Sequence, residues 1–158
     1  MKIIVISDTH LESPDDRFLE IYEKNLKDCD LLLHAGDITG IEMLSFLNGE
    51  KFESVAGNMD GSDIRASLPG KLTVKANGAS IGLIHGWGTP WGIEDRLLKE
   101  FQNVDCIVYG HTHAPRNSSK NGILMFNPGT LLDRRFSDVN TFGILRVEKE
   151  LTGEIVRV

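Results

Sequence analysis

Residues 2–10 read KIIVISDTH, and this stretch decides the fold. Residues 3–6 are all β-branched, which predicts a strand that is covered on both of its faces. Asp8 and His10 follow that strand directly. Open α/β sheets bind ligands at the carboxyl ends of their strands, so this junction is the first candidate for a functional site.

The rest of the first half of the chain repeats this arrangement. Residues 31–35 and 52–56 predict two further strands, and residues 15–27 and 41–47 predict the helices between them. This succession of strand, helix, strand, helix and strand favours a parallel α/β sheet.

The second half is richer in expected strands. A helix is expected at residues 93–101, before a strand at residues 105–109. Turns are expected at residues 77–78, 121–122 and 152–153, each of which ends in glycine. The strands around these turns are expected at residues 71–76, 80–85, 123–126, 142–148 and 154–158. We therefore expect mixed sheets.

Composition limits the class of protein. The chain has 158 residues, of which 41% are hydrophobic, and a formal net charge of -6. This length and apolar content predict one domain, residues 1–158. The acidic balance argues against a broad nucleic-acid-binding surface, which needs a basic face. Residues 1–7 are too short an apolar run for a signal peptide or a membrane span. Cys29 and Cys106 form no CxxC pair, so a cytoplasmic protein with reduced thiols is expected.

Seven polar side chains follow the expected strands at intervals close to one βαβ unit. They are Asp8, His10, Asp37, Asn58, His85, His111 and His113. We expect them to converge on one crevice at the carboxyl ends of the strands. Imidazole and oxygen donors without a thiolate fit a divalent transition metal such as Mn, Fe, Co, Ni or Zn. If Asp37 bridges through its two oxygens, the set divides into two four-ligand shells, which describes a binuclear centre.

The order of these residues resembles the calcineurin-like metallophosphoesterase family. The family motifs Asp-x-His, Gly-Asp, Gly-Asn-x-Asp, His-Gly and Gly-His-x-His all occur in order between Asp8 and His113. Residues 127–130, Asn-Pro-Gly-Thr, are similar to the Asn-Pro-Gly-Ser segment of the small family members. The resemblance implies an α/β sandwich of two packed mixed β-sheets flanked by helices.

The resemblance also implies a metal-dependent phosphoric ester hydrolase. A hydroxide that bridges two divalent ions would attack phosphorus in line, and Asp37, Asn58 and His85 would form the catalytic set. Manganese is the first expectation for these ions, with nickel, cobalt, iron or zinc as alternatives. The first ion would be bound by Asp8, His10, Asp37 and His113, and the second by Asp37, Asn58, His85 and His111.

Met59 departs from the pattern of the larger family members. It occupies the third position of Gly-Asn-x-Asp, where many of them carry a histidine that is thought to protonate the leaving oxygen. A thioether cannot donate a proton. The chain thus resembles the small phosphodiesterase branch, and a small phosphodiester is the expected substrate. The alternatives are a phosphomonoesterase and a protein-interaction scaffold of the retromer-subunit type with vestigial or no catalysis. Homo-oligomerisation is left open.

Residues beside the motifs have expected roles of their own. His34 is expected to pack or hydrogen-bond behind the site. Asp60 is expected either to orient His85 or another ligand, or to cap the following turn. Trp87 and Trp91 are expected to anchor their glycine-rich loop by burial, with stacking on a base or an aromatic leaving group as the alternative. The arginines for which either a phosphate contact or a solvated surface position is expected are Arg116, Arg134 and Arg135.

Overall fold

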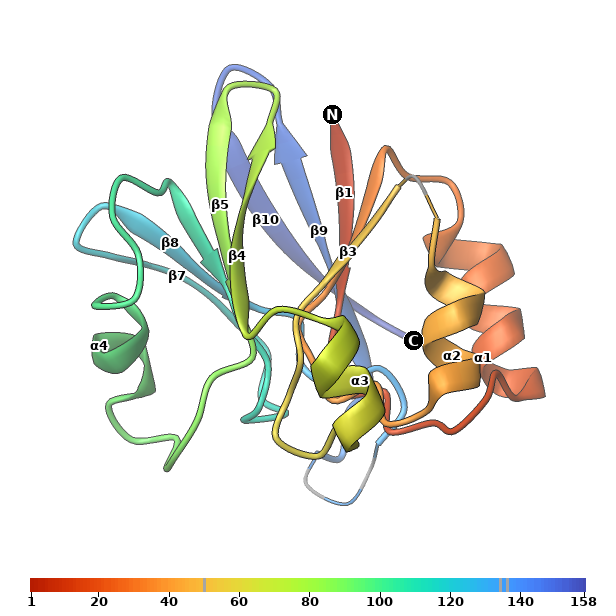
Figure 1. The fold of residues 1–158 in the computed structure, drawn as a ribbon. Coiled ribbons are helices and arrows are strands. Elements are labelled where there is room, and N and C mark those ends of the chain that lie inside the picture. Colours follow the sequence, from red (N-terminus) through yellow and green to blue (C-terminus); the bar gives the residue numbers. More distant parts are fainter. Residues whose placement is uncertain (50, 134, 136) are drawn as a thin grey trace.

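The computed structural model describes residues 1–49, 51–133, 135 and 137–158, and its first β-sheet has the strand order β10-β9-β1-β2-β3 (Figure 1). Strands β1 to β3 are parallel, and the β9–β10 hairpin pairs antiparallel with β1. These strands are β1 (Lys2–Ile6), β2 (Leu31–His34), β3 (Phe52–Ser54), β9 (Thr141–Val147) and β10 (Leu151–Arg157).

The second sheet has the order β4-β5-β6-β8-β7. Strands β5, β6 and β8 are parallel in its centre, and β4 and β7 pair antiparallel at its two edges. Both sheets are therefore mixed, as predicted. The strands of this sheet are β4 (Lys71–Ala76), β5 (Ala79–Ile84), β6 (Cys106–Val108), β7 (Arg116–Lys120) and β8 (Ile123–Asn127).

Helices cover the outer faces of the two sheets. α1 (Asp16–Ile21) continues into the π-helical turn η1 (Tyr22–Leu26), and these pack with α2 (Ile41–Leu47) and α3 (Ser62–Ser67) against the first sheet. α4 (Ile93–Leu97) packs against the second sheet, on the opposite side of the molecule in Figure 1. Within the described ranges, no helix has the length and apolar character needed to cross a membrane.

Strand β1 explains this layering, because its side chains alternate between two cores. Ile3 and Val5 pack between the sheets, in one cluster with Phe126 of β8. Ile4 and Ile6 pack with the helices on the outer face. All four β-branched residues are fully buried. The strand is thus covered on both faces, as its sequence predicts.

The turn expected at residues 152–153 is wrong. Both residues lie inside β10, and the hairpin turns at residues 148–150. Gly153 is a strand glycine because a Cβ there would come within 2.6 Å of the Phe126 ring. The turns at residues 77–78 and 121–122 are confirmed between β4 and β5 and between β7 and β8.

Two elements have no counterpart among the predictions, and one is shorter than expected. Strand β7 reads Arg-Asn-Ser-Ser-Lys and lacks the apolar residues by which buried strands are found, because it is an edge strand. Helix α3 buries only Ile64, which is too little for a helical pattern. The helix expected to reach residue 101 ends at Leu97.

Candidate metal centre

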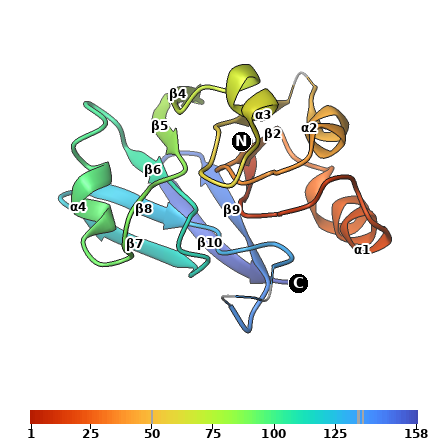
Figure 2. The ribbon, with the colours of Figure 1, turned by 60° about the horizontal axis from the view of Figure 1, so that its bottom comes forward.

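The seven predicted donor residues lie at the edge of the molecule where both sheets present carboxyl ends, which Figure 2 turns forward. Asp8 and His10 follow β1, Asp37 follows β2 and Asn58 follows β3. The remaining three come from the second sheet, after β5 and β6: His85, His111 and His113. The crevice is therefore built jointly by the two sheets.

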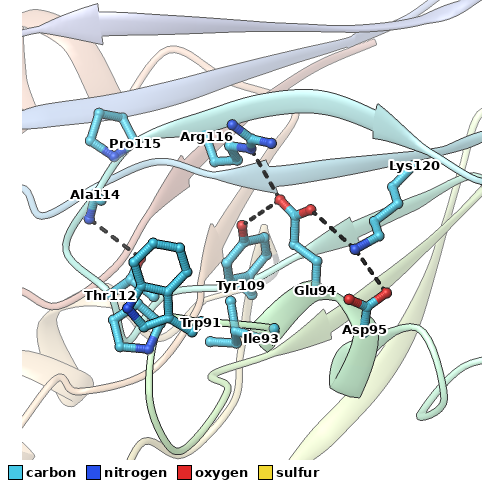
Figure 3. A pocket seen from close by; sticks show the side chains of 12 residues that line it. Trp91, Ile93, Glu94, Asp95, Tyr109, Thr112, Ala114, Pro115, Arg116 and Lys120 are labelled. Carbon is cyan, nitrogen blue, oxygen red and sulfur yellow. Dashed lines mark hydrogen bonds and ion pairs between the residues drawn. The ribbon is translucent and has the colours of Figure 1, made fainter.

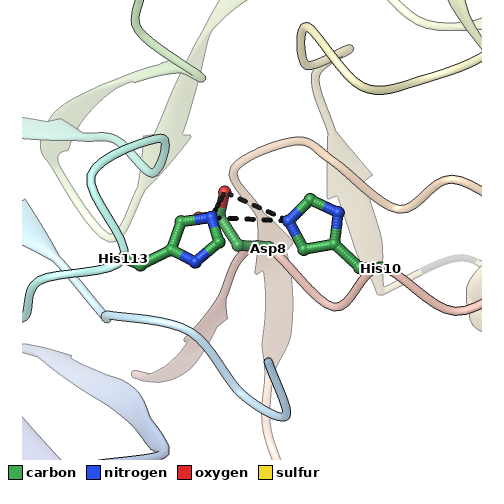
Figure 4. A group of neighbouring side chains, drawn as sticks. All are labelled: Asp8, His10 and His113. Atoms are coloured by element: carbon green, nitrogen blue, oxygen red, sulfur yellow. Dashed lines mark hydrogen bonds and ion pairs between the residues drawn. The ribbon is translucent and has the colours of Figure 1, made fainter. Parts of the chain in front are cut away.

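Asp8, His10 and His113 form one group, in which potential ligand atoms lie within 4.8 Å of one another (Figure 4). Asp8 Oδ1 is 3.2 Å from His113 Nε2 and 4.0 Å from His10 Nε2. The second oxygen, Oδ2, accepts the backbone N–H of His111 at 3.1 Å. Oδ1 is buried and has no hydrogen-bond partner among the described residues. A buried carboxylate oxygen without a donor is costly alone, and a cation would compensate it.

Asp8, Asp37 and His85 form a second group of the same size. Asp37 Oδ2 lies 3.4 Å from His85 Nε2 in its own group and 3.9 Å from His10 Nε2 in the first group, so one oxygen of this carboxylate is near an imidazole of each group. That position suits a bridging ligand.

Asn58 extends the second group towards His111. Its Oδ1 is 3.0 Å from His85 Nε2 and 2.9 Å from His111 Nδ1. The other nitrogen of His111, Nε2, lies 2.8 Å from the carbonyl of Gly88, to which it can donate. Donation from Nε2 leaves Nδ1 as the nitrogen that offers a lone pair to a metal.

The backbone of the site is held in an uncommon conformation. Five of the seven predicted donors have φ between 51° and 67°, in the left-handed region that non-glycine residues rarely adopt. Such strain persists where the surrounding structure over-determines it, and it is concentrated at functional sites. The five residues are Asp8, His10, Asp37, His111 and His113.

Two glycines allow the donor side chains to approach the neighbouring loops. A Cβ on Gly57 would overlap Asp37 Oδ1, and a Cβ on Gly110 would lie 2.7 Å from Asp8 Oδ2. Both positions require glycine because a carboxylate passes directly over the backbone.

His34 lies behind the site, as predicted. It is fully buried, its Nε2 is 3.1 Å from Thr9 Oγ1, and its Nδ1 accepts the backbone N–H of Gly36. Since Nδ1 is an acceptor, Nε2 carries the proton and donates to Thr9. His34 thus fixes the loops after β1 and β2 through neutral hydrogen bonds.

Asp60 acts on the backbone around Asp37. Its carboxylate accepts the N–H groups of Gly57 at 2.7 Å, Thr39 at 2.8 Å and Asp37 at 3.2 Å. The orientation of His85 has a different source, because its Nδ1 donates to the carbonyl of Ala35 at 2.7 Å. Asp60 therefore positions the loops that carry Asp37 and Asn58, so of the expected roles the structure favours support of a ligand other than His85.

The Asn-Pro-Gly-Thr segment connects the loops of the two sheets. Asn127 Nδ2 donates to the carbonyl of Gly110 at 2.8 Å, and Thr130 Oγ1 donates to the carbonyl of Asp8 at 2.8 Å. Both side chains are fully buried. The segment therefore fixes the loop after β1 relative to the loop after β6.

Asp133 is a site residue that the sequence-based prediction missed. Its Oδ2 lies 3.7 Å from His10 Nε2 and 3.7 Å from His113 Nδ1. Arg135 donates to both carboxylate oxygens of Asp133, at 2.7 to 3.0 Å. None of the motifs quoted above includes Asp133. In the sequence, its position three residues after Thr130 is the one feature that places it near the site.

A cavity of about 380 Å³ opens beside the donor residues, and we call it the metal cavity. Met59 lines it with 57% of its surface exposed. Arg135 lines it as well, while Arg116 lies elsewhere, paired with Glu94 at 3.1 Å. Arg134 falls outside the described residues.

The anchoring role expected of the two tryptophans is wrong. Trp87 is 43% exposed and Trp91 is 88% exposed, so neither fixes the loop by burial. The Arg96 guanidinium holds the loop instead, because it donates to the carbonyls of Trp87, Thr89 and Trp91. The Trp91 side chain in particular is left almost wholly exposed.

The electrostatics of the site favour a cation. Burial lowers the pKa of His10. Burial also opposes protonation of His113, but the nearby carboxylates of Asp8, Asp133 and Asp37 outweigh it and raise the pKa of this imidazole. The pKa of His85 is raised in the same way, against burial, by Asp37. Carboxylates that stabilise imidazolium create a negative potential that also attracts a metal ion.

Comparison with known proteins shows the family. The family model described as the calcineurin-like phosphoesterase superfamily domain matches residues 1–150. The chain belongs to this family. Members of the calcineurin-like phosphoesterases depend on divalent metal ions, and the donor groups above are candidates for holding them. The predicted fold, two packed mixed sheets, is confirmed by the same comparison.

Curated relatives cover most of the chain. A probable metallophosphoesterase of Methanocaldococcus jannaschii is 39% identical over 82% of the chain and 68% of its own length. One of Methanothermobacter thermautotrophicus is 33% identical over 99% of the chain and 92% of its length. A phosphodiesterase of M. jannaschii is 26% identical over 99% of both chains.

Solved structures share the fold. An archaeal phosphodiesterase superposes with a TM-score of 0.77 at 22% identity, over all of both chains. The Thermotoga maritima protein TM1076 has a TM-score of 0.74 at 30% identity over 99% of both chains. Vps29 of Entamoeba histolytica, solved with Zn²⁺, has a TM-score of 0.69 at 23% identity over 99% of both chains.

Proposed function

We propose that the protein is a metal-dependent phosphodiesterase that hydrolyses a small phosphodiester. The observation that carries this proposal is a pair of neighbouring groups of potential ligand atoms that share the buried Asp8, whose Oδ1 has no hydrogen-bond partner among the described residues. The groups are Asp8–His10–His113 and Asp8–Asp37–His85, and Asn58 extends the second towards His111. A calcineurin-like phosphoesterase with this donor set fits a phosphate ester as substrate. The archaeal phosphodiesterase relative, which matches over nearly its whole length, supports the diester class.

We assign the donors to two ions that share Asp37, because its Oδ2 lies near His10 of the first group and near His85 of the second. When bound, two divalent ions supply an activated water and the positive charge that holds phosphoryl oxygens. The catalytic set is Asp37, Asn58 and His85. The first ion is assigned to Asp8, His10, Asp37 and His113, and the second to Asp37, Asn58, His85 and His111.

Manganese is the first candidate metal, and nickel, cobalt, iron and zinc are alternatives. Nitrogen and oxygen donors bind each of these ions, so their availability and the geometry of the site decide among them. The zinc in Entamoeba Vps29 supports zinc as an ion that this fold accepts.

Met59 supports a diester over a monoester. It lines the metal cavity where a proton donor would assist a strongly basic leaving oxygen, and its thioether has no proton to give. The leaving group of the proposed substrate must therefore depart without being protonated by the side chain at position 59.

The test compares bis-p-nitrophenyl phosphate with p-nitrophenyl phosphate. Metal-stripped protein is reloaded separately with Mn, Ni, Co, Zn and Mg, and turnover is measured for the wild type, His85→Ala and Lys27→Ala. Lys27 is the matched control because it pairs with Glu23 on an exposed turn. We expect metal-dependent diester turnover that His85→Ala abolishes and Lys27→Ala retains. Faster monoester turnover would overturn the diester assignment.

A protein-interaction scaffold is the second candidate, and its support is the fold shared with Vps29. Tight metal binding without turnover of either ester would favour it. Light scattering on the same samples tests for the homo-oligomer, and cell fractionation tests the cytoplasmic location that we propose.

A further inference from the structure

A second cavity, which we call the side cavity, opens next to the metal cavity (Figure 3). Its volume is about 460 Å³, within the range of roughly 300 to 1,000 Å³ typical of small-molecule sites. Pro90 and Thr112 line both cavities. Thr112 lies between His111 and His113, so the side cavity begins one residue from two proposed metal donors. A phosphodiester at the metal centre would therefore extend one ester arm towards it.

Trp91 gives the side cavity an exposed aromatic wall. Trp91 is 88% exposed, and Ile93 and Tyr109 continue the apolar lining behind it. Arg96 holds this part of the loop through the carbonyl of Trp91, at 2.9 Å, and not through the indole. The ring is thus available to stack on a flat ligand without loss of loop structure.

The polar groups of the side cavity are already balanced in charge. Glu94 accepts from Tyr109 Oη at 3.3 Å and from Arg116 Nε at 3.1 Å. Lys120 Nζ lies 2.8 Å from Asp95 Oδ1. Two cations paired with two carboxylates leave no excess positive charge for a second phosphate. A carboxylate has about four lone-pair sites, so Glu94 retains capacity for further N–H donors.

We propose that the side cavity binds the nucleobase of a phosphodiester substrate, stacked on Trp91 with its N–H groups directed to Glu94. An uncharged, flat group that donates hydrogen bonds matches the aromatic wall, the balanced charges and the remaining acceptor capacity. In the view of Figure 3, the indole lies on the Thr112 side of the cavity and the Glu94 network on the other. The inference rests on the proposed function, because the phosphate attached to that base lies at the metal centre.

Adenosine tests the side cavity separately from catalysis, since it has a base and no phosphate. Zinc-loaded protein is titrated with adenosine and with ribose, and the indole N–H signals of both tryptophans are followed by NMR. We expect adenosine to shift the Trp91 signal saturably and ribose to leave it unchanged. Calorimetric titration, which does not need the Trp91 signal, should show no adenosine binding for Trp91→Ala and weakened binding for Trp91→Phe. Trp87→Ala is the matched control, because Trp87 lies in the same loop but lines a different cavity.

Two esters with the same leaving group test the role of the side cavity in turnover. Thymidine 5′-(p-nitrophenyl phosphate) carries a base, and methyl p-nitrophenyl phosphate does not. Base stacking predicts that Trp91→Ala lowers kcat/KM for the first by about 5- to 100-fold, mainly through KM, and leaves the second unchanged.

The outcomes separate the two proposals. If the wild type hydrolyses neither ester, the phosphodiesterase function fails and the adenosine titration alone decides the inference. An equal loss for both esters, or adenosine that does not shift the Trp91 signal, overturns the inference.

Discussion

At the scale of single residues, we predict that Met59, which lines the metal cavity, limits the esters that the site can hydrolyse. We expect Met59→His to supply a proton donor at the rim of the metal cavity. The rate for phenyl phosphate, which has a basic leaving group, should rise by about 10-fold or more relative to p-nitrophenyl phosphate. Met59→Gln is the control, because an amide of similar length does not protonate a leaving group. An equal effect of the two substitutions would remove the role assigned to this position.

A substitution at Asp8 should remove the stabilisation that metal binding gives while the protein still folds. Asp8→Asn keeps an acceptor for the His111 N–H and replaces the oxygen that has no donor among the described residues. With metal at 100 times its dissociation constant, the wild type should gain about 2.7 kcal/mol of unfolding free energy and the variant should gain none. Urea denaturation with and without metal measures both values. A gain of the same size in the variant would show that Asp8 is not a ligand.

His34 makes stability depend on pH. Burial lowers the pKa of its imidazole to about 3, so the folded state keeps it neutral while the unfolded chain protonates it near 6.5. The unfolded state then binds more protons, and stability falls as pH drops from 6.5 towards 3, by up to about 1.4 kcal/mol per pH unit. The variant His34→Gln should lose this part of the slope in denaturation curves taken across that range. An unchanged slope would contradict neutral burial of His34.

At the scale of elements, the loops after the strands hold the donors in place. Gly57→Ala puts a Cβ onto Asp37 Oδ1, so we expect metal affinity to fall by about 10-fold or more. Gly61→Ala is the matched control, since a Cβ there meets no described heavy atom within 4 Å. Calorimetric titration with Mn²⁺ compares the two. Equal affinities would show that the close approach of Asp37 to Gly57 does not matter.

Elements also show how far the sequence could predict this molecule. β1 was predictable because a strand buried on both faces is apolar at every position. β7 was not, because an edge strand needs only backbone pairing, and Arg116 to Lys120 carry no apolar residue. The seven candidate donors stand in motifs that directly follow strands, so the sequence alone could place them at one edge of the sheets. Asp133 reaches His10 and His113 only through the folded path of residues 127–133. The exposure of Trp91 could not be predicted either, because Arg96 holds this loop through backbone carbonyls, which leave no pattern in the side chains.

At the scale of the whole molecule, Phe126 ties the two sheets together. It is fully buried on β8, and its ring lies against Gly143 of β9 and Gly153 of β10 in the other sheet. Phe126→Ala should lower the free energy of unfolding by about 3 to 5 kcal/mol. If residues 1–158 form one domain, as predicted, both sheets should unfold in the same transition.

Two probes in a Cys29→Ser background test this cooperativity. Far-UV circular dichroism reports mainly helices, three of which cover the first sheet, while labelling of Cys106 reports the second sheet. Burial raises the pKa of the Cys106 thiol, so it reacts only when that sheet opens. We expect the two denaturation curves to coincide, and to shift together in Phe126→Ala. Phe46→Ala, on the exposed side of α2, should shift them less. Curves that separate would divide the sheets into independent units, and the donors supplied by each sheet would then be brought together by docking rather than by one folding event.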